Sequence, residues 1–101
     1  MQSQRQPLSL DTESPDAAPY FTWDAPVTNG EIRRALRDGT PDERLHWIAR
    51  ILREARYDHI WRYVSLRQDV LPNWDRIRPQ LGRQRAMFEF LIDRWRRAGR
   101  I

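Results

Sequence analysis

The sequence contains no cysteine and no lysine. The absence of cysteine excludes disulfides, thiolate catalysis and cysteine-ligated zinc, and it is typical of proteins from a reducing cytosol. No stretch approaches the roughly 18 apolar residues of a membrane-spanning helix, and residues 1 to 5 lead into no apolar core of a signal peptide. We therefore expect a soluble, cytoplasmic protein with no membrane association.

Motifs that carry chemistry are also scarce. The four glycines fall at expected boundaries between segments, which leaves none for a phosphate-binding loop. The two histidines, His46 and His59, belong to no cluster of metal ligands. Arg53 is followed six residues later by His59, a spacing that resembles the Arg-to-His motif of helical ribonucleases that cleave between protomers. Because this spacing arises easily in an arginine-rich chain, we expect no enzyme activity, metal, cofactor or small-molecule substrate.

The 18 basic residues are all arginine and are unevenly distributed. Residues 1 to 30 carry one arginine against four acidic residues, whereas residues 31 to 101 carry 17 arginines against 10 acidic residues. The basic part of the chain has the charge needed to bind DNA or RNA. Its last helix, however, places several arginines beside acidic residues and offers few side chains that read bases. Nucleic-acid binding is therefore the second hypothesis for function.

The region from Thr40 to Arg56 has the clearest helical pattern of the chain. Thr40 and Glu43 have the spacing of a capping box, with Pro41 at the first helical position. Apolar residues then cover more than half of the circumference: Leu45, Trp47, Ile48, Ala49, Ile51, Leu52 and Ala55. Because a helix lying on one neighbour needs an apolar stripe of only about 100°, we expect the rest of the chain to cover this central helix from two sides.

Capping residues predict three further helix starts: Thr28 with Glu31, Asp58, and Ser65 with Gln68. Gly39 ends the first of these helices, and prolines at positions 72 and 79 interrupt the later segments. The last helix runs from about residue 83 to 98, with one apolar arc: Met87, Phe88, Leu91, Ile92 and Trp95. It should pack on the central helix, so that Trp95 and Ile48 share one core. The sequence thus predicts an all-α domain, a compact bundle of five to six short helices over residues 27 to 101.

Residues 1 to 26 contain four prolines and no periodic apolar face, which predicts an extended or disordered arm. Three aromatic residues nevertheless occur within four positions of this arm: Tyr20, Phe21 and Trp23. They form either a docking motif for a partner or a cluster that folds back onto the helical domain.

Phe90 lies outside the apolar arc of the last helix. Its neighbours on the outer face are arginines: Arg83, Arg94 and Arg97. An exposed aromatic ring surrounded by arginine is typical of an interface anchor. The alternative is that the segment around Trp74 or the N-terminal aromatic residues bury the ring.

A resemblance covers roughly residues 31 to 101. It is carried by Arg53-Glu54-Ala55-Arg56-Tyr57-Asp58, Ile60-Trp61, Arg78-Pro79, Leu81-Gly82-Arg83, Arg85, Phe88-Glu89-Phe90-Leu91 and Trp95-Arg96. In these residues the chain resembles small helical bacterial proteins encoded beside nucleotidyltransferase toxins of the abortive-infection class. The resemblance implies a partner-binding protein, such as an antitoxin that occludes such a toxin.

Taken together, the sequence predicts a non-catalytic protein that binds a macromolecular partner, most simply a protein. The residues expected to make the contact lie in the arm and on the outer face of the last helix: Tyr20, Phe21, Trp23, Arg83, Phe90, Arg94 and Arg97. A DNA- or RNA-binding regulator is the alternative, and a helical ribonuclease is the third hypothesis.

Overall fold

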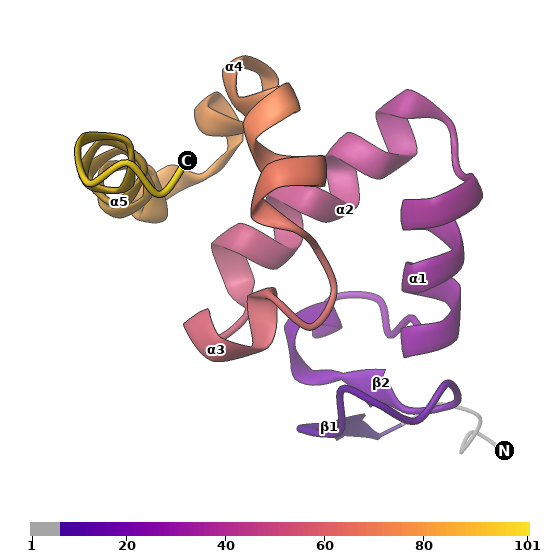
Figure 1. The fold of residues 1–101 in the computed structure, drawn as a ribbon. Helices are drawn as coiled ribbons and strands as arrows, with labels where there is room; N and C mark the ends of the chain where they lie inside the picture. Colours follow the sequence, from indigo (N-terminus) through magenta and orange to yellow (C-terminus); the bar gives the residue numbers. More distant parts are fainter. Residues whose placement is uncertain (1–6) are drawn as a thin grey trace, which may run out of the picture.

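The structure is a computed structural model that describes residues 7 to 101. Its central element is α2 (Pro41–Glu54), and the other helices are arranged around it (Figure 1). Within this range the fold is helical apart from one parallel pair of two-residue strands, β1 (Leu8–Ser9) and β2 (Ala18–Pro19). The prediction of an all-α fold of short helices is therefore confirmed.

The two predicted capping boxes at the first long helices are both formed. In α1 (Asn29–Asp38), the hydroxyl of Thr28 accepts from the amide of Glu31, whose carboxylate accepts from the amide of Thr28 in return. Thr40 and Glu43 make the same reciprocal pair at the start of α2. The amide hydrogen bonds hold the pKa of Glu31 and that of Glu43 below their usual range.

Gly39 ends α1, as predicted, but it does not adopt the left-handed conformation that is typical of glycine at the end of a helix. Its φ of −72° is one that any residue adopts. A Cβ at this position would instead lie 2.4 Å from the carbonyl oxygen of Ala35. The short link between α1 and α2 therefore needs glycine, because any side chain at this position would collide with the last turn of α1.

The core forms around the apolar arc of α2, which contributes Ile48, Ala49, Ile51 and Leu52. Ile32 of α1 covers it on one side, and residues from the second half of the chain cover it on the other: Ile60, Val64, Val70, Trp74, Ile77, Leu81, Phe88 and Ile92. The expectation that the central helix is covered from two sides is confirmed.

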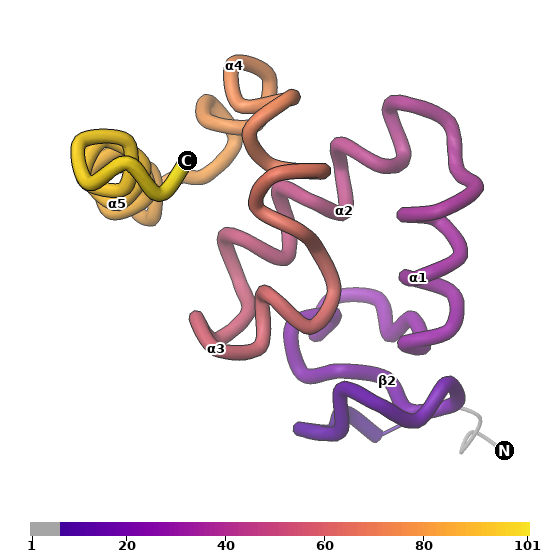
Figure 2. The backbone as a smooth tube through the Cα atoms, viewed as in Figure 1, coloured from indigo at the N-terminus to yellow at the C-terminus, as the bar shows by residue number. Residues whose placement is uncertain are grey.

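The second half of the chain is a series of short helical turns (Figure 2). After α3 (Tyr57–Ile60) come a π-helical turn (Leu66–Val70), a 3-10 turn (Leu71–Asn73), α4 (Trp74–Ile77) and two 3-10 turns (Arg78–Gln80 and Gly82–Gln84). Proline lies within two of these turns, at positions 72 and 79, and removes the amide that a longer helix would need.

Two of the predicted caps in this region differ in the structure. The residue before α3 is Arg56, so Asp58 lies inside the helix and does not cap it. At the π-helical turn, the hydroxyl of Ser65 accepts from the amide of Gln68 as expected. The return bond, however, involves Asp69, whose carboxylate accepts from the amide of Ser65 at 2.7 Å.

The last helix, α5 (Arg85–Arg97), lies at one edge of the molecule and buries only one side (Figure 1). Phe88 and Ile92 belong to the common core, whereas Trp95 packs at its border and is only partly buried. Met87, which the apolar arc assigns to the core, is 39% exposed.

Residues 7 to 26 are part of the fold, which corrects the prediction of an extended or disordered arm over residues 1 to 26. Ala18, Phe21 and Thr22 are each about 1% exposed, and Phe21 is a member of the core. Residues 1 to 6 lie outside the described residues. Nowhere in residues 7 to 101 is there a helix of the length and apolarity needed to cross a membrane.

Candidate functional site

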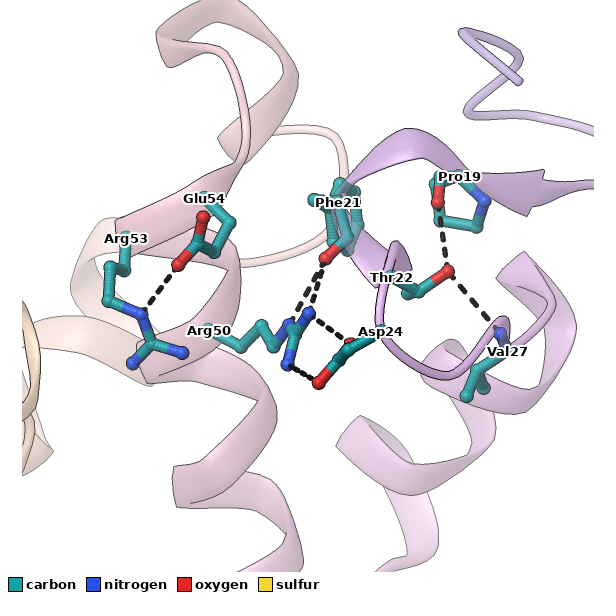
Figure 3. Close-up of polar contacts among 8 residues, drawn as sticks. All are labelled: Pro19, Phe21, Thr22, Asp24, Val27, Arg50, Arg53 and Glu54. Carbon is teal, nitrogen blue, oxygen red and sulfur yellow. Dashed lines mark hydrogen bonds and ion pairs between the residues drawn. The ribbon is translucent and has the colours of Figure 1, made fainter. Parts of the chain in front are cut away.

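The N-terminal segment is fixed to α2 by the side chain of Arg50 (Figure 3). Its Nε and Nη2 donate to the carbonyl oxygen of Phe21 at 3.1 and 3.0 Å. Nη1 donates to Oδ2 of Asp24 at 3.0 Å, and Nη2 donates to Oδ1 of the same carboxylate. The hydrogen bond from Arg50 lowers the pKa of Asp24.

Arg50 lies outside the apolar arc of α2, a position where a charged side chain ordinarily faces water, and yet it is buried. It is only 9% exposed. The helical position is as predicted, but the N-terminal segment covers it and supplies the acceptors that a buried guanidinium requires.

Tyr20 forms a second attachment point for this segment. Its hydroxyl accepts from the backbone amide of Arg56 at 2.7 Å and lies 2.9 Å from Nδ1 of His59. The hydroxyl of Tyr20 and Nδ1 of His59 share one hydrogen bond, in which the tautomer of the imidazole decides which of the two donates. His59 is 6% exposed and therefore has a structural role in the junction between α2 and α3.

The predicted Arg53 and His59 pair has separate partners in the structure. Arg53 donates to the carboxylate of Glu54 and to the carbonyl oxygen of Gln80, both at 2.9 Å. His59 is bound to Tyr20. Each side chain thus contributes to packing between segments rather than to a shared pair.

The three aromatic residues predicted as a docking motif have different positions. Phe21 is buried in the core and Tyr20 is bound to His59, so the structure corrects their assignment as partner contacts. Trp23 is 64% exposed, and its ring lies 5.7 Å from the guanidinium carbon of Arg50. The wide apolar arc of α2 was the signal in the sequence that a further segment must cover it.

We define the α5 outer face as Met87, Phe90, Arg94 and Arg97, together with Arg83 of the preceding turn. Phe90 is 60% exposed at the middle of this face. The buried side of α5 faces the direction midway between Phe88 and Ile92. At 100° per residue, the side chain of Phe90 points to the opposite side of the helix. Of the two alternatives that the sequence left open, the structure therefore supports an exposed ring and not a ring buried by the segment around Trp74 or by the N-terminal aromatic residues.

The arginines of this region differ in how far their charge is neutralised. Arg97 pairs with Asp93 at 3.0 Å, and Arg85 pairs with Glu89 at 3.1 Å. Arg83 and Arg94 have no ion pair with any carboxylate among residues 7 to 101. The α5 outer face therefore combines two exposed apolar side chains with a net positive charge.

Comparison of the chain with protein-family models, curated proteins and solved structures found no match. Over the described part of the chain there is also no group of three or more histidine, aspartate or glutamate residues arranged to hold a metal ion. The functional interpretation therefore depends on the surfaces that the fold presents.

Proposed function

We propose that the protein is a non-catalytic binding protein that holds an acidic protein partner on the α5 outer face. The observation that carries this proposal is the exposure of Phe90, at 60%, on the side of α5 opposite to the core. A large apolar side chain that is mostly exposed contributes little to the stability of the isolated domain. It gives a partner an anchor, and Arg83 and Arg94 provide free positive charge beside it.

The composition of the face fits a protein partner better than a nucleic acid. Phenylalanine, methionine and arginine are enriched at the centre of protein interfaces. A surface that tracks the phosphates of duplex DNA, by contrast, places its unpaired cations where the backbone passes and has little use for an apolar ring at their centre. Asp93 already neutralises Arg97 at this face, which further weakens the case for duplex DNA.

The resemblance to proteins encoded beside nucleotidyltransferase toxins indicates which partner to test first. We propose that the chain acts as an antitoxin-like or inhibitor-like protein in the bacterial cytoplasm and occludes a toxin-like enzyme. Trp23, which is 64% exposed, is the residue in the N-terminal segment that remains available for a second contact.

The test is to purify the tagged protein from its native cell, identify the bound protein by mass spectrometry, and titrate the two purified components. Phe90→Ala should weaken binding by about 2 kcal/mol or more, or about 30-fold in Kd, if the ring is a hot spot. Leu10→Ala is the matched control, because Leu10 is 61% exposed in a different part of the molecule. It should leave the affinity unchanged.

The alternative, a DNA- or RNA-binding regulator, predicts a different pattern. Arg94→Gln with Arg83→Gln should then weaken binding to genomic DNA fragments and flatten its salt dependence by about 0.9 log units for each phosphate that is no longer bound. Phe90→Ala should have little effect on that binding. Tight, salt-dependent DNA binding that does not depend on Phe90 would refute the protein-partner proposal.

A further inference from the structure

A cleft on a different side of α5 combines aromatic and arginine side chains. It has a volume of about 390 Å³ and is formed between α3, the π-helical turn and the residues that follow α5. Its aromatic residues are Tyr57, Trp61 and Trp95, and its basic residues are Arg67 and Arg100. Trp95 lies about 140° around the helix axis from Phe90 at 100° per residue, so the cleft is separate from the α5 outer face.

The aromatic rings in the cleft are positioned by packing. Tyr57 and Trp61 lie edge to face, with centroids 5.9 Å apart and planes at 82°. Trp61 and Trp95 pack against the border of the core, whereas Tyr57 is 45% exposed. Because the two tryptophans are held by the core, the cleft presents aromatic surface that a flat ligand can stack on without rearranging the fold.

The charged side chains of the cleft are both arginines. Arg67 donates through Nη2 to the carbonyl oxygen of Arg100, which holds these two residues together at one side of the cleft. A guanidinium has five N–H donors, so Arg67 keeps donors free for a ligand. Among the described residues that line the cleft, none is acidic.

We propose that this cleft binds a nucleotide, with the base stacked on the aromatic side chains and the phosphate held by Arg67 and Arg100. Both halves of the site are needed for this ligand, since stacking on tyrosine or tryptophan tolerates any base and guanidinium groups suit phosphate oxygens. A quaternary ammonium ligand also prefers aromatic surroundings, but the two arginines, which form no ion pair with a carboxylate of residues 7 to 101, repel it. The volume of about 390 Å³ lies within the range of small-molecule sites.

The nucleotide has two sources, a free mononucleotide or one residue of a single-stranded nucleic acid. The experiment separates them by titrating the full chain with AMP in a calorimeter, and with a fluorescein-labelled hexanucleotide of adenylate by fluorescence anisotropy. Binding of AMP as tight as that of the hexanucleotide assigns the site to free nucleotides. Binding of the hexanucleotide alone assigns it to a single strand.

Two variants test the residues. Tyr57→Ala removes the most exposed ring and should weaken binding at least five-fold, in line with the measured contribution of one stacked base. Arg67→Gln with Arg100→Gln should weaken it further and, for the hexanucleotide, flatten the salt dependence by about 0.7 log units for each phosphate that is no longer bound. Circular dichroism verifies that each variant is folded.

The matched control is Arg34→Gln with Arg37→Gln, which removes the same charge from exposed positions of α1. If this control weakens binding as much as the cleft variant, the attraction is general and the proposal is wrong. The same holds if neither AMP nor the hexanucleotide binds at millimolar concentration. Phe90→Ala should not change nucleotide binding, so failure of this proposal is distinguishable from failure of the proposed function.

Discussion

Arg50 and Asp24 face each other as a two-point ion pair, with Nη1 of the arginine 3.0 Å from Oδ2 of the aspartate. The same guanidinium also binds the backbone of the N-terminal segment, because Nε and Nη2 donate to the carbonyl oxygen of Phe21. One side chain of α2 thereby supplies four hydrogen bonds to a segment that has almost no regular secondary structure. The order of that segment should depend on Arg50 more than on any other polar residue.

Replacement of Arg50 by methionine keeps the length of the side chain and removes all of its donors. We expect the free energy of unfolding to fall by about 1.5 to 3 kcal/mol, the range for hydrogen bonds that involve a charged group. Arg37→Met is the control, since Arg37 and Asp38 form an exposed pair of a kind that contributes less than about 1 kcal/mol. Urea unfolding followed by tryptophan fluorescence measures both. Equal decreases in the two variants would contradict the role assigned to Arg50.

The pair of Arg50 and Asp24 should also make the stability of the fold depend on pH in the acid range. The pKa of Asp24 is lowered in the folded protein by Arg50, so the folded state favours the ionised carboxylate. The stabilisation is complete above the ordinary aspartate pKa of 3.8 and is lost as the pH falls through the lower folded value. Asp24→Asn should therefore be less stable than the natural protein at pH 6, and this difference should shrink toward pH 3. A difference that stays constant over this range would show that the charge of Asp24 contributes nothing.

Tyr63 predicts the opposite behaviour in alkali. Burial raises its pKa from 10.0 to about 12, and its hydroxyl donates to Oδ1 of Asn29 at 2.6 Å. The contribution of protonated Tyr63 to the free energy of unfolding is complete below pH 10. It is lost as the pH rises through the pKa of Tyr63 in the folded protein, because the unfolded chain releases this proton at lower pH. The natural protein should thus lose more stability than Tyr63→Phe between pH 9 and pH 11. The absence of lysine simplifies this comparison, since tyrosines are the main groups that titrate there.

Phe21→Ala tests whether the N-terminal segment belongs to the domain. Phe21 is 1% exposed, so truncation should cost about 3 to 5 kcal/mol. Trp23→Ala removes a larger side chain two residues later, but Trp23 is 64% exposed, and the cost should be about 0.5 kcal/mol or less. Deletion of residues 1 to 26 should accordingly unfold or strongly destabilise the protein. A deleted chain with unchanged helical content and melting temperature would restore the idea of a separate arm.

The helices of this protein were predictable because their signals are local. The capping boxes at Thr28 and Thr40 and the apolar arc of α2 each lie within a few turns of the chain, and the structure contains them all. The same helical geometry placed Phe90 on the outer face of the last helix, but it left open whether another segment buries the ring. The prediction that Met87 belongs to the core was wrong. Its helix, α5, lies at the edge of the molecule and buries a narrower part of its apolar arc than the sequence predicts.

The attachment of the N-terminal segment was not predictable in its details, since side chains from distant helices hold this segment in place. Nδ2 of Asn29 donates to the carbonyl oxygens of Asp11 and Ser14 at 2.8 and 3.0 Å, and Arg62 donates to the hydroxyl of Thr12. Such bonds leave no periodic pattern in the segment itself. The cleft around Trp61 and Trp95 was missed for a similar reason, because no spacing in the sequence indicates that α3, the π-helical turn and the end of α5 meet.

The long-range contacts of the N-terminal segment also predict the order in which parts of the protein fold. The hydrogen bonds of Phe21, Tyr20 and Thr12 reach partners 29, 39 and 50 positions later in the chain. Such long loops close at a cost in entropy, whereas α1 and α2 are adjacent and capped locally. The N-terminal segment should therefore dock last, although it precedes α1 and α2 in the chain. In stopped-flow experiments, Phe21→Ala should therefore mainly increase the unfolding rate and hardly change the refolding rate. If the refolding rate instead falls in proportion to the decrease in stability, the N-terminal segment belongs to the folding nucleus.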